Sequence, residues 1–304
     1  MISGETRYAS LLCTSVECFS TEMSMKYRTF GPTGQSVSVI GMGTWRLNGD
    51  RAQAVTALRT GMDLGVNHID TAEMYGDAEL IVGEAIKGRR EDVFLVSKVL
   101  PQNASRRGTR AACEQSLKRL GTDRLDCYLL HWRGSVPLEQ TVGAFVDLQR
   151  EGKIRSWGVS NFDTDDLKEA YGFDAAPGES VVCDQVLYHL EERAIEHAVI
   201  PSCEQHGVAV VAYSPFGSGD FPDPKSPEGQ VLAEIAKAHA ATPRQVALAF
   251  LIRHPSVFAI PKTGNPKRAA ENAAACDVVL SAEEIATIDR TFPRGAIPRS
   301  LPMI

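Results

Sequence analysis

The sequence predicts an α/β protein built as a single (β/α)8 TIM barrel, with an N-terminal β-hairpin at the barrel floor and a C-terminal helix. Three observations support this fold class. Short apolar runs rich in β-branched residues alternate with amphipathic segments eight times from about Lys26 onward. No break in composition separates two domains. Some runs are continuously apolar, as at Val208–Val211, which is typical of parallel strands buried on both faces.

The order of elements follows from these runs. Residues 1–24 mix charged and small polar side chains and are interpreted as a disordered extension, so the barrel is assigned to residues 25–304. The turn Gly31–Gly34 predicts a hairpin over Tyr27–Ser38. Strands are predicted at Val37–Gly41, Asn67–Asp70, Asp92–Lys98, Leu125–His131, Ile154–Ser160, Val181–Val186, Val208–Ser214 and Val257–Pro261. Helices are predicted at Ala52–Leu64, Ala78–Lys87, Arg110–Leu120, Leu138–Gly152, Thr164–Ala170, Ala194–His206, Glu228–Ala240, Pro243–Arg253, Pro266–Ala275 and Ser281–Thr291.

The closing helix has a recognisable start, because Ser281 can cap it and Glu284 stands in capping-box position.

The alternative architecture is a doubly wound open sheet. Its usual glycine signature is missing, since Gly41-Met42-Gly43 is followed by Thr44-Trp45-Arg46 and completes no GxGxxG.

Composition excludes several classes of function. The chain has 304 residues and a net charge of -6, which favours neither nucleic acid nor an anionic membrane surface as a partner. No apolar run approaches the roughly 18–20 residues of a transmembrane helix. The seven cysteines are scattered, without CxxC or zinc-like spacing, so we expect reduced thiols, a cytoplasmic protein and no metal site.

Polar side chains gather at the predicted strand ends. Asp70, Lys98 and His131 end three consecutive strands, and Tyr75 follows the first of these. Active sites of such barrels lie at the C-terminal ends of the strands, so these four side chains can converge. Each alone has an ordinary explanation, such as a helix cap, a solvated lysine, a loop tyrosine or a core histidine; the combination is harder to dismiss. Further polar or aromatic residues stand at or next to other strand ends: Trp132, Ser160, Asn161, Gln185, Tyr213 and Ser214.

A tyrosine beside a lysine suggests proton donation. Free tyrosine has a pKa of about 10, which is high for an acid at neutral pH. A cation about 4 Å away contributes about 4 kcal/mol at an effective dielectric of about 20, or roughly three pKa units, whereas burial acts in the opposite direction. We expect the charge of Lys98 to prevail if Asp70 keeps it protonated, and a neutral His131 to orient a substrate carbonyl. Since no side chain supplies hydride, a nicotinamide cofactor is expected.

Several separated motifs resemble those of the aldo-keto reductases, over nearly the whole chain from about residue 27. They are Asn67–Gly76, Leu129–Trp132 and Trp157–Phe162. The resemblance implies a catalytic tetrad of Asp70, Tyr75, Lys98 and His131. It also implies that Ser160, Asn161 and Gln185 bind the nicotinamide carboxamide, that Tyr213 stacks on the ring, that Ser214 and the next loop touch the pyrophosphate, and that Gly43, Thr44, Trp45 and Trp132 line the cofactor and the substrate mouth.

The block Ile260–Arg268, with Glu271 and Asn272, resembles the family's adenosine phosphate site, and Thr263 lies within it. Lys262 and Arg268 can pair with a 2′-phosphate, so NADP(H) is the expected cofactor. The tail beyond Phe292 is short, which implies an open, unselective pocket. The sequences of Asp70–Gly76, Leu95–Val99 and Gln185–His189 most resemble a bacterial branch of the family whose members reduce methylglyoxal and other small or aromatic aldehydes. The expected partner is therefore a small carbonyl compound, and the expected oligomeric state is a monomer.

Two other functions remain open. The chain could be a cofactor-binding sensor or regulatory subunit with little turnover. It could also be a barrel aldolase or isomerase in which Lys98 forms a Schiff base. The second alternative leaves Tyr213, Gln185 and the cluster from Lys262 to Arg268 unexplained.

Overall fold

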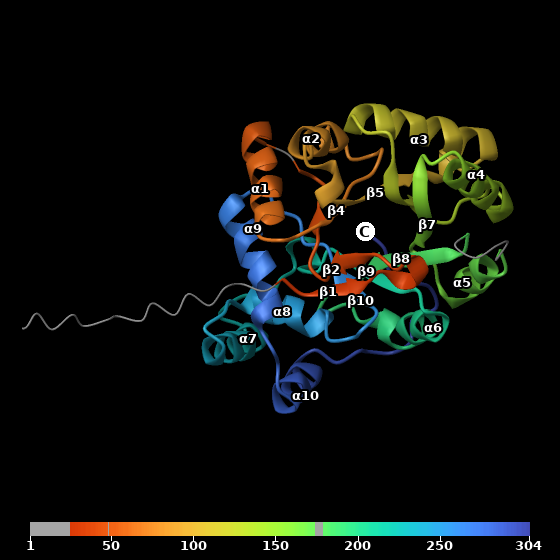
Figure 1. Ribbon diagram of the computed structural model, residues 1–304. Coiled ribbons are helices and arrows are strands. Elements are labelled where there is room, and N and C mark those ends of the chain that lie inside the picture. Colours follow the sequence, from red (N-terminus) through yellow and green to blue (C-terminus); the bar gives the residue numbers. More distant parts are fainter. Residues whose placement is uncertain (1–24, 48, 174–178) are drawn as a thin grey trace, which may run out of the picture.

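The computed structural model describes residues 25–47, 49–173 and 179–304 of the chain, so the predicted extension at residues 1–24 lies outside it. Eight parallel strands form one curved sheet in the order β10-β9-β8-β7-β6-β5-β4-β3 (Figure 1). Parallel bridges from Ile40 to Ala259 and from Gly43 to Lys262 close it into the predicted barrel. The strands are β3 (Met42–Gly43), β4 (His68–Asp70), β5 (Phe94–Val99), β6 (Leu125–Leu130), β7 (Ile154–Ser160), β8 (Val181–Leu187), β9 (Ala209–Tyr213) and β10 (Val257–Ala259).

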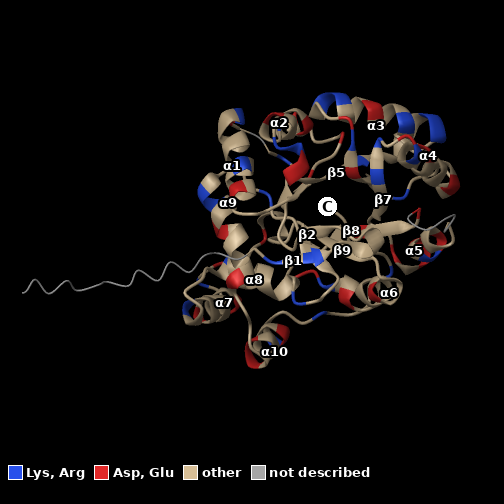
Figure 2. Cartoon of the chain, in the orientation of Figure 1, with Lys and Arg blue, Asp and Glu red and all other residues tan. Residues whose placement is uncertain are grey.

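Helices surround the sheet and carry most of the charged side chains, whereas the strands are largely apolar (Figure 2). Asp50, Ser105 and Ser226 cap three of them with side-chain oxygens, and Ser281 forms the predicted capping box with Glu284. In the described part of the chain, no helix is long and apolar enough to span a membrane. The helices are α1 (Arg51–Asp63), α2 (Ala78–Ala85), α3 (Arg106–Leu120), α4 (Leu138–Arg150), α5 (Thr164–Tyr171), α6 (Val199–His206), α7 (Pro227–Ala238), α8 (Pro243–Leu251), α9 (Pro266–Ala273) and α10 (Ala282–Thr291).

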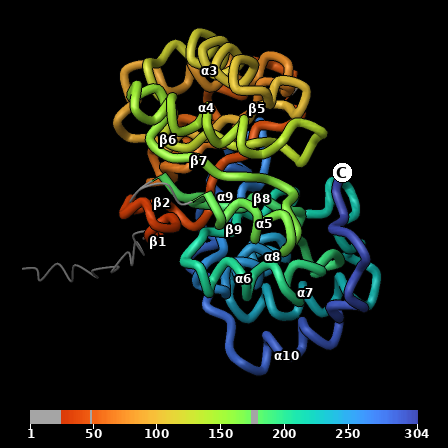
Figure 3. The backbone as a smooth tube through the Cα atoms, turned by 90° about the vertical axis from the view of Figure 1, so that its right-hand side faces the viewer, coloured from red at the N-terminus to blue at the C-terminus, as the bar shows by residue number. Residues whose placement is uncertain are grey.

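The predicted hairpin seals the floor of the barrel. Strands β1 (Tyr27–Thr29) and β2 (Ser36–Ser38) pair antiparallel, and Phe30 between them is fully buried. Its ring lies 4.7 Å from Phe94 and 5.0 Å from Phe258, measured between centroids, at the N-terminal ends of β5 and β10. In Figure 3 the hairpin and the C-terminus lie at opposite ends of the barrel, so the mouth is at the end away from Phe30.

Two predicted elements differ from the structure. The strand expected at Val37–Gly41 is divided, because Val37 pairs with Arg28 in the hairpin and the first barrel strand begins only at Met42. The helix expected at Ala194–His206 is a 3₁₀ turn at Ala194–Glu196 followed by α6. Pro201 explains the break, because it lacks the N–H that a continuous helix would bond to the carbonyl of His197 and is tolerated only in a first turn.

A buried carboxyl group supports the turn that ends β7. Asn161, the first residue of this turn, has a φ of 60°, and the N–H of the next residue, Phe162, donates to Asp184 Oδ1 over 3.4 Å. Asp184 is fully buried, and its Oδ2 has no hydrogen-bond partner within the described ranges. Burial, with a smaller contribution from Asp166 and Asp163, holds the pKa of Asp184 well above its usual value. Burial therefore favours the protonated, neutral form of this carboxyl group.

The packing of Phe30 in the barrel floor makes a testable contribution to stability. Phe30→Ala should lower the free energy of unfolding by about 3–5 kcal/mol, because it leaves a cavity in a closely packed aromatic cluster. Urea denaturation measures this, with Ile297→Ala as control, since that side chain is 74% exposed. A loss below about 1 kcal/mol would mean that the hairpin does not seal the barrel.

Asp184→Asn should change how stability depends on pH. The folded state holds a proton that the unfolded state releases above a pKa of about 3.9. The wild-type free energy of unfolding should therefore fall by about 1.4 kcal/mol for each pH unit between that value and the folded pKa. The variant should lack this loss, so denaturant titrations should show its stability relative to wild type increasing as the pH rises above the unfolded pKa of about 3.9. Asp77→Asn, which removes an exposed carboxyl, is the control; parallel curves for wild type and Asp184→Asn would contradict a buried neutral group.

Candidate active site

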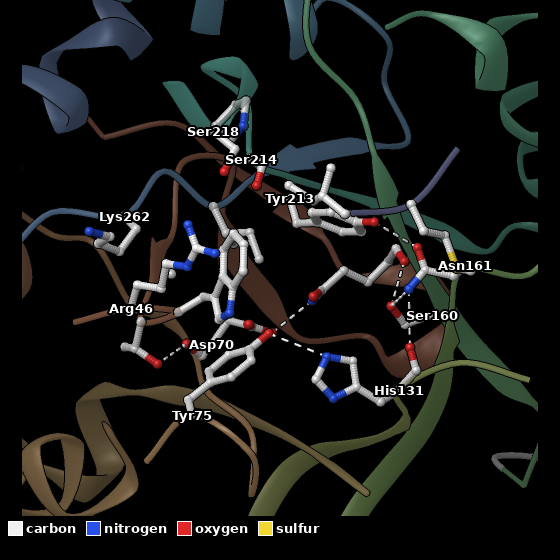
Figure 4. A pocket seen from close by; sticks show the side chains of 18 of the residues that line it. Arg46, Asp70, Tyr75, His131, Ser160, Asn161, Tyr213, Ser214, Ser218 and Lys262 are labelled. Atoms are coloured by element: carbon white, nitrogen blue, oxygen red, sulfur yellow. Dashed lines mark hydrogen bonds between the residues drawn. The ribbon is translucent and has the colours of Figure 1, made fainter. Parts of the chain in front are cut away.

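A cavity of about 580 Å³ opens at the C-terminal ends of the strands (Figure 4). Gly43 lies at its base, where a Cβ atom would come within 2.6 Å of the carbonyl oxygen of Ile260, so only glycine allows the barrel to close there. The predicted residues that line this one cavity are Gly43, Thr44, Trp45, Asp70, Tyr75, His131, Trp132, Ser160, Asn161, Gln185, Tyr213, Ser214 and Lys262.

Beneath the cavity lies a buried ion pair. Lys98 Nζ is 2.5 Å from Asp70 Oδ1 and donates a second hydrogen bond to the carbonyl oxygen of Thr71 at 2.9 Å. Neither side chain is more than 2% exposed. Burial alone would lower the pKa of Lys98, but the carboxylate of Asp70 and the hydroxyl of Tyr75 outweigh it, so the pKa lies above its usual value. Lys98 is thus protonated, as expected.

Tyr75 and His131 face each other at the floor of the cavity. The hydroxyl of Tyr75 is 3.4 Å from His131 Nε2, and the ring of Tyr75 lies with its centroid 5.0 Å from Lys98 Nζ. Burial, and then the charge of Lys98, lower the pKa of His131 to about 2. A pKa this low leaves the imidazole neutral at neutral pH, and its Nε2 lies beside the Tyr75 hydroxyl.

The expectation that the charge of Lys98 prevails at Tyr75 and lowers its pKa is wrong. Burial raises the pKa of Tyr75, and the opposing attraction of Lys98 is smaller. The physical reason is that Asp70, which keeps Lys98 protonated, also cancels part of its field at the phenol. The pair stabilises a phenolate less than an isolated cation would.

A chain of hydrogen bonds links the residues on the opposite wall of the cavity to one another. The Tyr213 hydroxyl donates to Asn161 Oδ1 at 2.8 Å, and Asn161 Nδ2 donates to the carbonyl oxygen of His131 at 3.1 Å. Ser160 Oγ donates to the carbonyl oxygen of Gln185. Gln185 Nε2 donates to Asp70 Oδ2 at 2.7 Å, so its amide nitrogen is occupied by the ion pair. Gln185 itself lines the cavity.

The mouth of the cavity is apolar and partly covered. Met74, Trp45 and Trp132 line it, together with Met303 and Ile304 from the tail. The expectation of an open site from the short tail is therefore corrected: Figure 1 places the C-terminus over the barrel mouth. No sequence signal pointed to Met303 and Ile304, because they reach the site only through the path of the tail.

Arg46 is a lining residue that the motifs did not indicate. It has a φ of 53°, and its guanidinium lies 4.3 Å from the centroid of the neighbouring Trp45 ring. In Figure 4 it lies on the same side of the cavity as Lys262, Ser214 and Ser218. Neither Arg46 nor Lys262 has an acidic partner in the part of the chain that is described, so this end of the cavity carries uncompensated positive charge. In the sequence, only the position of Arg46 directly after Trp45 could have indicated that it lines the cavity.

Four of the predicted cofactor-binding residues lie outside the cavity. Thr263 and Asn272 line a small crevice between the barrel and α9, and Arg268 is exposed on α9. Glu271 Oε1 accepts a hydrogen bond from Thr242 Oγ1 at the start of α8. Their assignment to an adenosine phosphate site stays a prediction.

The geometry argues against the Schiff-base alternative. Lys98 is fully buried, protonated and hydrogen-bonded to two oxygens. An ammonium group without access to the cavity has neither the lone pair nor the space to attack a carbonyl carbon.

The chain is similar to known proteins in both sequence and structure. Residues 39–292 match the model of the aldo/keto reductase family. Methylglyoxal reductase YeaE of Escherichia coli is 45% identical over 274 residues, covering 88% of this chain and 96% of its own. The glyoxal reductase of Bacillus subtilis is 35% identical, covering 84% and 89%.

Solved structures agree with this result. An aldo/keto reductase from Klebsiella pneumoniae in complex with NADP and acetate superposes with a TM-score of 0.85 at 46% identity, covering 92% of this chain and all of its own. A second structure of a Klebsiella pneumoniae aldo-keto reductase, with NADPH, has the same TM-score and identity. The cavity, the buried ion pair and these similarities together lead to one conclusion: the chain is an oxidoreductase that belongs to the aldo/keto reductase family.

Proposed function

We propose that this protein reduces aldehydes and ketones to alcohols with NADPH, and that Tyr75 donates the proton. The observation that carries the proposal is the arrangement at the cavity floor. A phenol and a neutral imidazole meet there above a buried lysine–aspartate pair. This arrangement can protonate and orient a carbonyl oxygen, and it contains no activated nucleophile.

The other end of the cavity suits a dinucleotide. Tyr213 offers an aromatic surface, Gln185 offers an amide oxygen, and Lys262 and Arg46 offer charges to phosphate groups. Both Klebsiella pneumoniae neighbours hold NADP or NADPH. When bound, the cofactor supplies hydride. Because Asn161 and Ser160 are hydrogen-bonded to neighbouring residues, their proposed bonds to a carboxamide require their second lone pairs or an exchange of partners.

Each floor residue then has a defined task. His131 Nε2–H donates to the substrate oxygen and orients the carbonyl, and the Tyr75 hydroxyl transfers its proton to the same oxygen. The raised pKa of Tyr75 does not prevent this transfer, because the alkoxide that develops on reduction is a far stronger base than phenolate. Lys98 stabilises the phenolate that remains, and Asp70 with Gln185 holds Lys98 in place.

The substrate class follows from the mouth. Trp45, Trp132, Met74 and Met303 offer apolar surface, and in the described chain the mouth has no acidic side chain. Small and aromatic aldehydes fit this surface, and the two named relatives are methylglyoxal and glyoxal reductases. We infer the same class here.

Tyr75→Phe should lower kcat for methylglyoxal by about 10²–10⁴-fold, the usual contribution of a general acid. The change is followed by the absorbance of NADPH, and NADPH binding, measured by fluorescence, should be unchanged. Equal rates in both proteins would identify a different proton donor. Tight NADPH binding without turnover of any carbonyl in the wild type would favour the sensor alternative.

Lys262→Met should weaken NADPH binding about 10–100-fold and NADH binding much less, because it removes a charge-assisted hydrogen bond to the 2′-phosphate. Arg268→Met should act in the same direction. Calorimetric titration with both cofactors measures the ratio, and Lys237→Met, at an exposed lysine on α7 outside the cavity and outside this block, is the matched control. An equal loss for NADPH and NADH would place Lys262 at the pyrophosphate instead.

A further inference from the structure

We propose that Glu73 is a positioning residue that holds Tyr75 in place for proton transfer; this inference rests on the proposed function. Tyr75 lies on the loop from Thr71 to Asp77, which joins β4 to α2. Much of this loop faces solvent: Met74 is 44% exposed, and Gly76 and Asp77 are exposed as well. Thr71 and Ala72 at the start of the loop are buried, whereas the residues on either side of the proton donor are exposed.

The carboxylate of Glu73 ties this loop to the next one. Glu73 Oε1 accepts hydrogen bonds from the backbone N–H of Leu100 at 2.7 Å and from Asn103 Nδ2 at 3.0 Å. The backbone N–H of Glu73 donates to the carbonyl oxygen of Lys98 at 3.3 Å. Leu100 and Asn103 directly follow β5, the strand that carries Lys98. The side chain of Glu73 thus adds to the backbone bond and ties the Tyr75 loop to the segment that follows its cationic partner.

Other side chains of the loop do not duplicate this contact. Thr71 Oγ1 is buried without a hydrogen-bond partner, and the side chain of Asp77 caps nothing at the start of α2. Within the described residues, Asp77 forms no ion pair or side-chain hydrogen bond either. Apart from Tyr75 itself, Glu73 provides the polar side-chain anchor of the loop.

Small displacements of Tyr75 matter because its hydroxyl has only loose contacts. Its distance of 3.4 Å from His131 Nε2 is longer than an ideal hydrogen bond (Figure 4). The ring rests against His131 and Lys98, and the hydroxyl interacts with the ammonium group of Lys98 as well as with His131. A misplacement of about 1 Å can cost on the order of a hundredfold in rate. The anchor two residues away therefore controls the position of the proton donor.

The nature of the contact predicts which substitutions are tolerated. Both donors to Glu73 Oε1 are neutral amides, so the amide oxygen of glutamine can accept the same two bonds. Glu73→Gln should preserve the anchor, and Glu73→Ala should lose it. Asn103→Ala removes one donor and should give an intermediate effect.

The experiment measures kcat and KM for methylglyoxal with NADPH in the full-length protein, together with the affinity for NADPH. In Glu73→Ala, kcat should fall about 10–100-fold with unchanged NADPH affinity. Glu73→Gln should stay within about twofold of wild type. Asp77→Ala is the matched control, since it removes a carboxylate from the same loop that makes no such contact. Wild-type kcat in Glu73→Ala, or an equal loss in Glu73→Gln, would overturn the inference.

A double-mutant cycle tests whether Glu73 acts through Tyr75. In a Tyr75→Phe background, Glu73→Ala should cause no further loss of residual activity. The same fold loss in both backgrounds would show that Glu73 acts elsewhere. If Glu73→Ala does not fold, Asn103→Ala replaces it in the same double-mutant cycle with Tyr75→Phe.

Hydrogen exchange separates this inference from the proposed function. In the protein without cofactor, the amides of residues 72–77 should exchange faster in Glu73→Ala than in wild type or Glu73→Gln. A wild type without carbonyl turnover would refute the proposed function, and this readout would still test the anchor. Unchanged exchange in Glu73→Ala would overturn the anchor, whatever the activity.

Discussion

The buried pair of Lys98 and Asp70 is the constraint on which the rest of the site depends. Removing two charges from water costs several kcal/mol for each ion, and their attraction compensates only when geometry and further hydrogen bonds are good. Here the carbonyl oxygen of Thr71 and the amide of Gln185 supply those bonds. The pair therefore fixes strands β4, β5 and β8 relative to one another, and the cavity floor is built on top of it.

The same pair explains the electrostatics of the site. Burial raises the pKa of Tyr75, and Lys98 offsets this rise only in part because Asp70 opposes its charge; burial and then the charge of Lys98 keep His131 neutral. The phenol is thus a weak acid at rest, and its acidity becomes useful only as a strong base develops on the substrate. The uncompensated cations Arg46 and Lys262 lie at the other end, so one cavity separates proton chemistry from phosphate binding.

Stability and chemistry occupy opposite ends of the barrel. Phe30 and its aromatic neighbours seal the floor, and loops such as Thr71–Asp77 form the mouth. Loops make few apolar contacts, so their positions depend on individual polar anchors such as Glu73. The closing segments of the chain reach over the same mouth, where Met303 and Ile304 complete its wall.

The sequence by itself determined the fold class and the residues at the strand ends, because strand periodicity and barrel topology place Asp70, Lys98 and His131 at one rim regardless of detail. It could not determine the sign of the pKa change at Tyr75, which depends on the balance between burial and two opposite charges. It missed Arg46, Met303 and Ile304, and it misplaced the first barrel strand, because Val37 suits a hairpin as well as a barrel. Only the tertiary structure decided these points, since each depends on contacts between residues far apart in the chain.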